Sequence, residues 1–411
     1  MRVAVVCGHF MPEVGYQEVW IARALARRGV QVRVVTTTAV SSSARKVRKR
    51  AYPAGLQQMP EGYEVLRLPV DFRFRSAVVA RGVVPAVVEW QPDAILLLGI
   101  GKLFGVPVLE AEALLDTPIS CFFSELAEYR RRHSLPARVV AWMQDRGFEL
   151  VKRVWYRKAI RRAQLLVCNT PGTLEWLRAC CKTQEEKAAL AQKARVQVLG
   201  YDHSLFFFDP AERELMRRQL GCQKGEIVAL TITRVLPHKG LERIIDAIGT
   251  LQRQGMSLRY VLIGGLRDKY QRQLEQRMRG QMYLQNFQLL PFQPPDQTRR
   301  FAAAADIGIW MQPAISTSEA MGVGLPVLLP RRLSLSHLIV EGISGWYWEE
   351  PGGFEMALQR AVESIVNLPE HARTEWHRQL AAAHTQRFAY EAILDQIINE
   401  LGLTLPCKVG T

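Results

Sequence analysis

The opening of the chain constrains the fold more than any other feature, because it alternates strand and helix patterns. Residues 3–7, VAVVC, form an apolar run that ends at Gly8, which is typical of a parallel strand buried on both faces. Residues 17–28 have helical periodicity and stop at Gly29, and residues 30–38, VQVRVVTTT, predict a second strand. A strand, a helix and a strand within so short a stretch predict a βαβ unit and a doubly wound parallel sheet.

The same alternation continues along the chain and then starts again. Further strands are expected at 94–100, 118–123 and 165–170, and a second series at 227–234, 258–265, 287–292, 305–311 and 326–330. A helix is expected at 240–255 between the first two strands of the second series. We therefore expect two α/β domains, residues 1–195 and 196–387, followed by a C-terminal helix and tail, 388–411, that returns to the first domain.

Charge and cysteine content narrow the class of protein. The 411 residues include 54 Lys and Arg against 39 Asp and Glu, a net charge of +15, which predicts a polyanionic partner such as nucleic acid, an acidic membrane or a phosphorylated substrate. The seven cysteines contain no CxxC pair, so neither a zinc site nor a disulfide framework is predicted, and a cytosolic compartment is expected. We expect no signal peptide, because the first residues are typical of a buried strand, and the longest apolar runs are too short to span a bilayer.

Two loops follow predicted strands and lead into predicted helices, where ligands of open α/β sheets bind. In residues 8–18, backbone N–H groups would favour an anion, but an ordinary turn is the simpler interpretation because no GxGxxG is present. In residues 233–240, TRVLPHKG, Arg234 ends a strand and Lys239 opens a helix. Two such cations can grip one diphosphate from two sides, while two solvated side chains explain the same pattern in so basic a chain.

Residues 309–327, IWMQPAISTSEAMGVGLPV, contain a single acid, Glu319. We expect a strand followed by a helix that begins near Ser318, with an anion-binding nest formed by the backbone amides of Ile315, Ser316, Thr317 and Ser318. Glu319 would then lie in the first helical turn, where a carboxylate suits the helix dipole. A helix-start carboxylate without further function explains Glu319 equally well at this point.

A basic segment, residues 130–162, holds eleven Lys and Arg among apolar side chains and only two acids. A basic amphipathic helix can lie on an anionic bilayer. A helix that faces the core and exposes a solvated basic back fits the pattern as well, so the sequence leaves both interpretations open.

Taken together, these motifs resemble the family 4 retaining glycosyltransferases of the GT-B fold. Residues 1–18 and 25–37 are similar to the N-terminal strand, the glycine loop and the second helix–strand pair of that family. The other matching stretches are 198–221, similar to its interdomain segment, 233–248, similar to its donor-phosphate motif, and 318–330 with 337–353, similar to its sugar-nucleotide motif. The resemblance implies two Rossmann-like domains that face an interdomain cleft, with the acceptor held by the first and the nucleotide by the second.

The resemblance also implies a role for each matched residue. Arg234 and Lys239 would hold the donor diphosphate and stabilise charge on the departing nucleotide, with added hydrogen bonds from the amides of residues 315–318. Glu319 would accept hydrogen bonds from the ribose hydroxyls, and Gly15 would allow donor and acceptor to approach the first domain closely. No metal ion is needed, because fixed cations replace it. Recognition of the base is expected near Pro291 and Phe292.

The chain departs from the family pattern at four places. The first of the two motif glutamates, which contacts the transferred sugar, is replaced near Gln312, whose amide still donates and accepts hydrogen bonds. The second glycine of the first loop is Tyr16, and the glycine before the phosphate-binding arginine is Thr233. Many members have a histidine after the strand corresponding to 118–123, but FFSELAEYRRR contains none, so donor contacts must be made differently.

These observations predict a retaining hexosyltransferase, free of metal and cofactor, that moves a sugar from a UDP- or GDP-linked donor to a lipid-linked or polysaccharide acceptor in cell-surface glycan synthesis. We expect it in the cytoplasm, with a peripheral position on the inner membrane face as a further expectation through residues 130–162. The alternative is a degenerate, non-catalytic protein of the same fold that binds a nucleotide sugar or a partner. Sequence-specific nucleic-acid binding is the weakest alternative, because no helix-turn-helix, RRM or zinc pattern is present.

Overall fold

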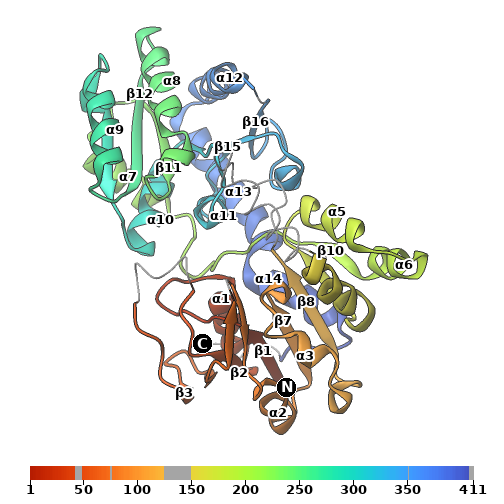
Figure 1. Cartoon of the computed structure of the whole chain (residues 1–411). Helices are drawn as coiled ribbons and strands as arrows, with labels where there is room; N and C mark the ends of the chain where they lie inside the picture. The colour runs from red at the N-terminus through yellow and green to blue at the C-terminus, as the bar shows by residue number, and fades with distance from the viewer. Residues whose placement is uncertain (42–48, 75, 125–149, 350, 407–411) are drawn as a thin grey trace, which may run out of the picture. The chain divides into compact units, whose positions relative to one another are not determined.

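The computed structural model describes residues 1–41, 49–74, 76–124, 150–349 and 351–406. The chain divides into two compact units, which we call unit 1 (Met1–Val198 and Ile393–Thr411) and unit 2 (Leu199–Ala392) (Figure 1). These bounds lie within a few residues of the expected domain limits, and residues from Ile393 onward belong to unit 1. Each unit is described separately below.

Unit 1 is built on a sheet whose strands run in the order β10-β9-β8-β7-β1-β2-β4-β3. All neighbours in this sheet are parallel except β3 and β4. The strands are β1 Arg2–Cys7, β2 Gln31–Thr37, β3 Gly55–Gln58, β4 Glu64–Leu68, β7 Ala94–Leu98, β8 Ile119–Phe123, β9 Leu165–Cys168 and β10 Ala194–Val196. A separate antiparallel hairpin pairs β5, Phe72–Phe74, with β6, Ala77–Val79.

Helices cover the unit 1 sheet and explain why its central strands are apolar throughout. Every residue of β7 and β8 is buried, as in parallel strands covered on both faces. The helices are α1 Gln17–Arg27, α2 Val83–Trp90, α3 Val106–Leu109, residues 150–162, α5 Pro171–Cys180, α6 Gln184–Lys193 and the unit 1 part of α14, Tyr390–Glu400. Within unit 1, α14 is anchored by ion pairs from Asp395 to Arg28 and from Glu400 to Arg195.

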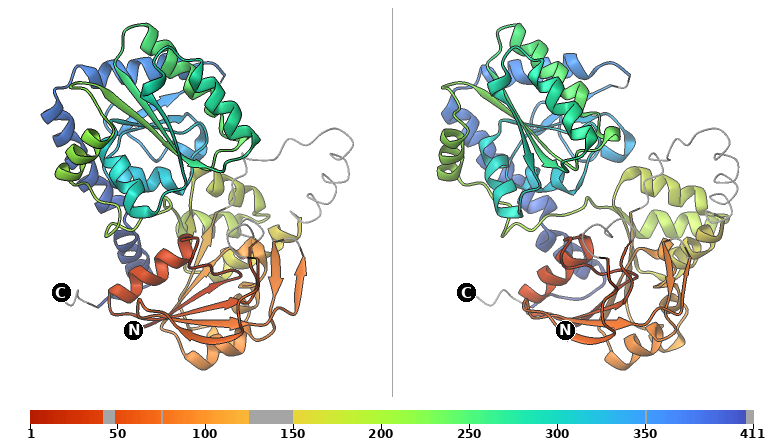
Figure 2. Two further views of the ribbon diagram at one scale, coloured as in Figure 1. Left: turned by 90° about the vertical axis from the view of Figure 1, so that its left-hand side faces the viewer. Right: turned by 60° about the vertical axis from the view of Figure 1, so that its left-hand side comes forward.

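Unit 2 is built on a fully parallel sheet of order β13-β12-β11-β14-β15-β16. Its strands are β11 Ile227–Ile232, β12 Leu258–Gly265, β13 Phe287–Pro291, β14 Ile307–Ile309, β15 Val327–Pro330 and β16 Gly345–Trp348. The helices are α7 Pro210–Gln219, α8 Leu241–Arg253, α9 Lys269–Arg279, α10 Pro295–Ala304, α11 Ile315–Gly322, α12 Phe354–Val366 and α13 Glu370–Phe388. Residues of α8, α9 and α12 share one apolar core with the strands, and Figure 2 shows helices flanking the strands in both views.

The predicted fold of two doubly wound α/β domains is therefore confirmed, with one antiparallel pair, β3–β4, at the edge of the unit 1 sheet. Because every strand of the unit 2 sheet is parallel, the loops that follow β11, β13 and β14 lie at the same edge, which we call the carboxyl edge. Short 3₁₀ turns complete the loops: Ile100–Lys102 (η2), Glu112–Leu114, Pro237–Lys239, Leu284–Asn286 and Leu333–Leu335.

Candidate active site

The loop after β11 and the segment before α11 are held together at the carboxyl edge of unit 2. The carbonyl oxygen of Ile232, the last residue of β11, accepts hydrogen bonds from Ser316 Oγ at 2.6 Å and Trp310 Nε1 at 3.0 Å. Gly240, at φ 64°, lies so close to Met311 that a Cβ would come within 3.2 Å of its side chain. The loop carrying the predicted cations is therefore packed directly against the segment carrying Gln312.

Arg234 and Lys239 are the two positively charged residues of the loop after β11. Arg234 is exposed and Lys239 is half-buried, and neither forms an ion pair with any residue that the structure describes. Burial, and then the nearby charge of Arg234, lower the pKa of Lys239 to about 8 from its ordinary value of 10.5. Two neighbouring cations that lack an acidic partner among the described residues leave a site for an external anion.

The helix that follows starts earlier than the sequence analysis predicted. The expected beginning near Ser318 is wrong, because α11 begins at Ile315, with Ala314 at the N-cap. Thr317 Oγ1 accepts a hydrogen bond from the Ala314 N–H at 3.1 Å, which replaces the usual capping side chain and stabilises the earlier start. The Thr317 amide already donates to the Ala314 carbonyl at 3.0 Å, so the amides of Ile315 and Ser316 remain best placed for an anion.

The predicted place of Glu319 in the first turn is wrong for the same reason: it is the fifth residue of α11, and the first turn contains no acid. Glu319 is half-buried, and burial raises its pKa to about 7 from 4.5, with no hydrogen bond or charge opposing the rise. The Oε1 atom of Gln312 is buried and has no hydrogen-bond partner among the described residues. This edge of unit 2 thus carries one buried, unsatisfied amide oxygen and two cations without an ionic partner in the described ranges.

The remaining predicted donor contacts lie at the same edge or in the other unit. Pro291 ends β13, and Phe292 follows it with a side chain that is 78% exposed. Gly15 lies in unit 1 at φ 65°, where a Cβ would come within 3.1 Å of Trp20 Cζ2. The fold itself therefore requires a glycine there, and its role toward a substrate remains a prediction.

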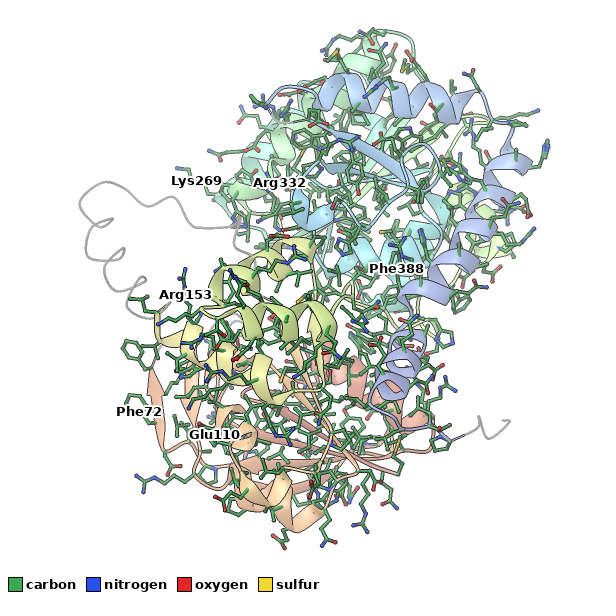
Figure 3. The ribbon with its side chains drawn as sticks, turned by 90° about the vertical axis from the view of Figure 1, so that its right-hand side faces the viewer. Phe72, Glu110, Arg153, Lys269, Arg332 and Phe388 are labelled. Atoms are coloured by element: carbon green, nitrogen blue, oxygen red, sulfur yellow. The ribbon has the colours of Figure 1, made fainter. Side chains whose placement is uncertain are left out.

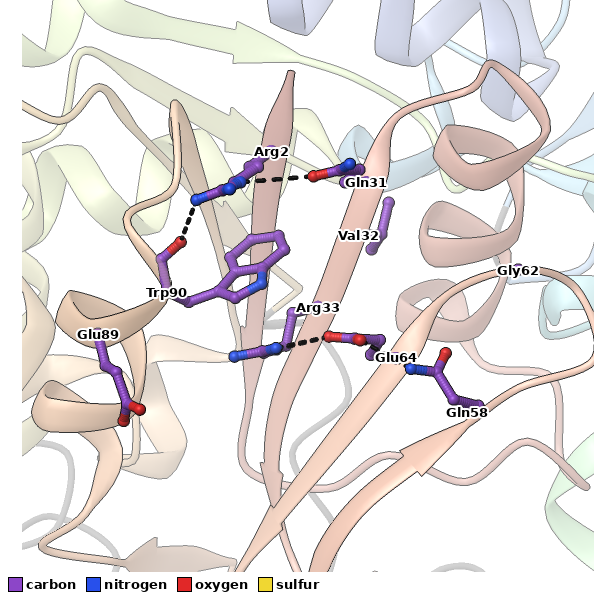
Figure 4. Close-up of a pocket in the computed structure, with 9 residues that line it drawn as sticks. All are labelled: Arg2, Gln31, Val32, Arg33, Gln58, Gly62, Glu64, Glu89 and Trp90. Atoms are coloured by element: carbon purple, nitrogen blue, oxygen red, sulfur yellow. Dashed lines mark hydrogen bonds and ion pairs between the residues drawn. The ribbon is translucent and has the colours of Figure 1, made fainter.

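Unit 1 also contains a larger pocket of about 560 Å³ at the amino ends of its strands, shown in Figure 4. Several of its polar groups already satisfy one another. Arg33 Nε donates to Glu64 Oε2 at 2.8 Å, and Gln58 Nε2 donates to Glu64 Oε1 at 2.7 Å (Figure 4). Polar groups without partners therefore identify the candidate site better than the volume of a pocket does.

Comparisons with known proteins show the family and the fold of the chain. Residues 17–190 match the family described as glycosyl transferase 4-like domain, and residues 212–379 match glycosyl transferases group 1. The crystal structure of Anabaena HepE in complex with UDP superposes with a TM-score of 0.67 at 19% identity, covering 98% of this chain and 100% of that one. The chain belongs to the GT-B glycosyltransferases.

Two curated relatives match this chain over only part of its length. This glycosyltransferase is 25% identical over 293 residues to D-inositol 3-phosphate glycosyltransferase of Segniliparus rotundus, covering 63% of this chain and 62% of the relative. It is 22% identical over 192 residues to alpha-monoglucosyldiacylglycerol synthase of Streptococcus pneumoniae, covering 45% of this chain and 42% of the relative. The chain thus spans less than two thirds of the relatives it matches.

The basic segment of the glycosyltransferase is described only in part, because residues 130–149 lie outside the described ranges. Residues 150–162 are helical, and Tyr156, Ala159 and Ile160 on this helix are buried in the unit 1 core. Leu150, Val151 and Val154 at its start are 63%, 48% and 48% exposed. Within the described ranges, no helix combines the length and apolar character needed to cross a membrane.

One residue that sequence reasoning missed is His9 in unit 1. Its side chain is only 4% exposed, and neither ring nitrogen has a hydrogen-bond partner in the described part of the chain. The signal available in the sequence was a lone histidine directly after the glycine that ends a buried strand. That pattern alone does not distinguish a binding residue from a core histidine.

Proposed function

We propose that this glycosyltransferase transfers a hexose, with retention, from a UDP- or GDP-linked donor to a lipid-linked or polysaccharide acceptor. The observation that carries the proposal is the pair Arg234 and Lys239, which has no ionic partner among the described residues and lies on a loop packed against the segment of Gln312. Gln312 Oε1 is buried without a hydrogen-bond partner in the described ranges, and Glu319 follows on α11. Cations suit a diphosphate, and uncharged or ionised acceptors suit ribose and sugar hydroxyls. A UDP-glucose complex of HepE supports the choice of donor class.

The proposed chemistry follows from where these groups lie. Breaking the bond between the anomeric carbon and the diphosphate oxygen leaves an electron pair on that oxygen. Arg234 and Lys239 would stabilise this charge, as fixed cations preorganised for a developing anion do. The acceptor hydroxyl forms the new bond at the same face of the sugar, and its proton passes to the leaving phosphate. In this proposal the two side chains supply the charge that a divalent metal supplies in other transferases.

Gln312 favours a second candidate function, a protein that binds a nucleotide sugar without transferring it. An amide in place of a carboxylate contacts sugar hydroxyls but provides no negative charge to stabilise a positively charged sugar in the transition state. The alternative predicts tight binding of the donor with neither transfer nor hydrolysis.

We also propose that unit 1 docks on the cytoplasmic face of an anionic membrane. The exposed apolar residues at the start of helix 150–162 lie beside Arg153, which is exposed as well. The β5–β6 hairpin adds Phe72 and Phe74, 59% and 52% exposed. Figure 3 labels Phe72 and Arg153, which lie toward the same side of unit 1 in that view. Exposed apolar side chains among cations suit the interface of an anionic bilayer.

A thermal-shift screen with UDP-, GDP- and ADP-sugars, followed by transfer and hydrolysis assays, tests the donor proposal. A donor at a hundred times its Kd is expected to stabilise the protein by about 2.7 kcal/mol. Lys239→Ala and Glu319→Ala are each expected to weaken donor binding and to reduce turnover at least tenfold, because each removes one contact to an ionised or hydroxyl group.

Lys224→Ala is the matched control, since Lys224 is an exposed lysine in the loop that precedes β11. It is expected to bind and turn over the donor as the parent does. Unchanged turnover in Lys239→Ala and Glu319→Ala would show that the site is assigned wrongly. Donor binding without transfer or hydrolysis would favour the non-catalytic candidate.

A further inference from the structure

A small cavity of about 50 Å³ lies at the carboxyl edge of the unit 1 sheet, separate from the groups of unit 2. Its walls come from the ends of β1, β7 and β8 and from the first turn of α1, and include Cys7, His9, Gln17, Glu18, Lys102 and Ser124. The chain leaves β1 for β2 on one side, while β7 and β8 lie on the other. This is the topological switch point of the sheet, where open α/β sheets bind ligands.

His9 is the cavity residue whose hydrogen-bonding groups have no partner in the described part of the fold. Although it is 4% exposed, both ring nitrogens lack a hydrogen-bond partner among the residues described. Burial, followed by the charges of Lys102 and Arg73, lowers the pKa of His9 to about 3, so the ring is neutral at physiological pH. A neutral imidazole offers one N–H donor and one acceptor, and leaving both unused in a buried position is unfavourable.

A second, independent observation comes from the turn that holds Lys102. Gly99 and Leu103 both have positive φ, 73° and 70°, and Leu103 is a bulky residue for which this conformation is strained. The turn is closed by hydrogen bonds from the Lys102 amide to the Gly99 carbonyl at 2.8 Å and from the Leu103 amide to the Ile100 carbonyl at 3.1 Å. The fold thus retains backbone strain at Leu103, next to Lys102, which lines the cavity and whose charge acts on His9.

A third observation is that polar groups behind the cavity are also incompletely paired. Asn169 is 4% exposed and donates from Nδ2 to Gln17 Oε1 at 3.3 Å, while its Oδ1 atom has no partner within the described ranges. Burial raises the pKa of Glu18 above its ordinary value, and the charge of Lys102 opposes that rise. The cavity is therefore surrounded by hydrogen-bond donors and hydrogen-bond acceptors.

The mixture of groups decides which ligand suits the cavity. The ammonium of Lys102 disfavours a cation, the carboxyl of Glu18 disfavours an anion, and the polar atoms of His9 disfavour an apolar group. Two or three heavy atoms fill a cavity of about this size, which compares with roughly 30 Å³ for one water molecule in the liquid. A hydroxyl or hydroxymethyl group, which donates and accepts at one atom, meets all of these conditions.

We propose that His9 binds a hydroxyl group of a carbohydrate or polyol substrate in this cavity. The proposal rests on the proposed function for its substrate class, but the cavity lies wholly within unit 1. The hydroxyl belongs either to the transferred sugar or to the acceptor, since both carry the same chemistry. An ordered water molecule that occupies the cavity permanently is the competing explanation.

Saturation-transfer NMR on the full chain with D-glucose, D-mannose, D-galactose and myo-inositol tests the proposal without any nucleotide. At least one of these probes is expected to give a signal, and His9→Phe, which keeps an aromatic ring without nitrogen, is expected to weaken binding roughly tenfold. His9→Gln, which restores a donor and an acceptor, is expected to recover part of the signal. Monodeoxy analogues of the best probe provide a second measurement on the parent protein, and loss of one hydroxyl is expected to remove its signal.

Absence of any signal with the parent protein, or equal signals from the parent and His9→Phe, overturns the proposal and favours a permanent water molecule. If His9→Phe does not fold, an undiminished signal from every monodeoxy analogue overturns it instead. The source of the hydroxyl follows from the affinities of UDP and UDP-glucose. A smaller difference between them in His9→Phe indicates the transferred sugar, and an unchanged difference with a lost sugar signal indicates the acceptor.

Failure of the proposed function gives a different result, because it shows as an absent thermal shift with nucleotide sugars and an absent effect of Lys239→Ala. Neither measurement involves His9. The two hypotheses can therefore fail separately.

Discussion

At the scale of single residues, Glu319 is a half-buried carboxyl that no charged or polar group within the described ranges stabilises. Its ionised form should therefore lower the free energy of unfolding. Burial raises its pKa to about 7, above the 4.5 of an exposed glutamate. The folded state therefore binds this proton more tightly than the unfolded state. The associated stability is complete below pH 4.5 and is lost as the pH rises through 7. We expect Glu319→Gln to raise the free energy of unfolding by about 1–2 kcal/mol at pH 8, discounted for partial exposure.

Urea unfolding at pH 8 and pH 5 measures this change, and the gain is expected to be much smaller at pH 5. Glu363→Gln is the control, because Glu363 is an exposed acid on α12. A variant that is more stable yet binds nucleotide sugars less well would identify Glu319 as a residue retained for binding. An equal gain of Glu319→Gln over the parent at pH 8 and pH 5 would contradict the assigned effect of burial.

The two basic residues proposed to bind an anion could be singled out from the sequence because their type and position carry the signal. Arg234 and Lys239 stand at a strand end and a helix start, and the structure leaves both without an ionic partner in the described ranges. His9 could not be predicted in this way, because an isolated histidine after a buried strand carries no signal until its missing partners are seen. The structure also offers an imidazole beside β8, the strand after which the sequence lacks the histidine usual in the family.

At the scale of secondary-structure elements, Asp306 joins four parts of unit 2. It lies between α10 and β14 and is 1% exposed. It forms ion pairs with Arg213 at 2.5 Å and Arg217 at 2.8 Å, both on α7. Its Oδ2 also accepts the amide of Val228 on β11 at 2.8 Å. Burial alone would raise the pKa of Asp306, but the two arginines hold it well below its usual range.

We expect Asp306→Asn to lower the free energy of unfolding of unit 2 by about 3–5 kcal/mol, because it leaves two buried guanidinium groups with only the half-exposed carboxylate of Glu370 as a counter-charge. Since the pKa is depressed in the folded state, the difference from the parent is present above pH 3.8 and shrinks as the pH falls further. Chemical denaturation measures it. Asp246→Asn is the control, because its ion pair with Arg277 is exposed and should contribute less than about 1 kcal/mol. Similar losses in the two variants would contradict the role of Asp306.

The helix boundaries show where element-level prediction fails. The pattern of apolar residues placed α1 and α8 within two residues of their observed ends, because periodicity marks the buried face directly. It placed the start of α11 three residues late, because the three residues after Ile315 all carry hydroxyl groups and any of them resembles a cap. The structure uses Thr317 to accept the Ala314 amide, an arrangement that depends on the fold and not on residue type alone.

At the scale of the whole molecule, the two-domain α/β class could be predicted because parallel strands buried on both faces have an unmistakable composition. The short pairs β3–β4 and β5–β6 could not, since two of these strands are largely exposed and lack that composition. The return of the chain to unit 1 was expected from a helix that follows a completed series of strands. Substrate specificity depends on a few polar atoms, so the pattern of apolar residues in the sequence reveals it least.

The net charge of +15 is also a property of the whole molecule, and it predicts how unit 1 meets a membrane. If docking is electrostatic, flotation with vesicles containing acidic lipid should recover the protein, and neutral vesicles should not. Arg153→Glu is expected to reduce recovery, because each cation near an anionic surface contributes about 1 kcal/mol, roughly a fivefold change in partitioning, and reversal roughly doubles the loss. Val151→Ser with Val154→Ser is expected to reduce it by removing apolar contact.

Lys224→Glu separates the two explanations for such a loss. It changes the net charge by the same amount as Arg153→Glu, but at an exposed lysine of unit 2. If total charge alone attracts the protein to the membrane, the two reversals should reduce recovery equally. If the surface around helix 150–162 and the β5–β6 hairpin is the docking site, only Arg153→Glu should do so. Equal recovery of the parent with neutral and acidic vesicles would exclude an electrostatic contribution and leave the exposed apolar residues as the reason for any binding.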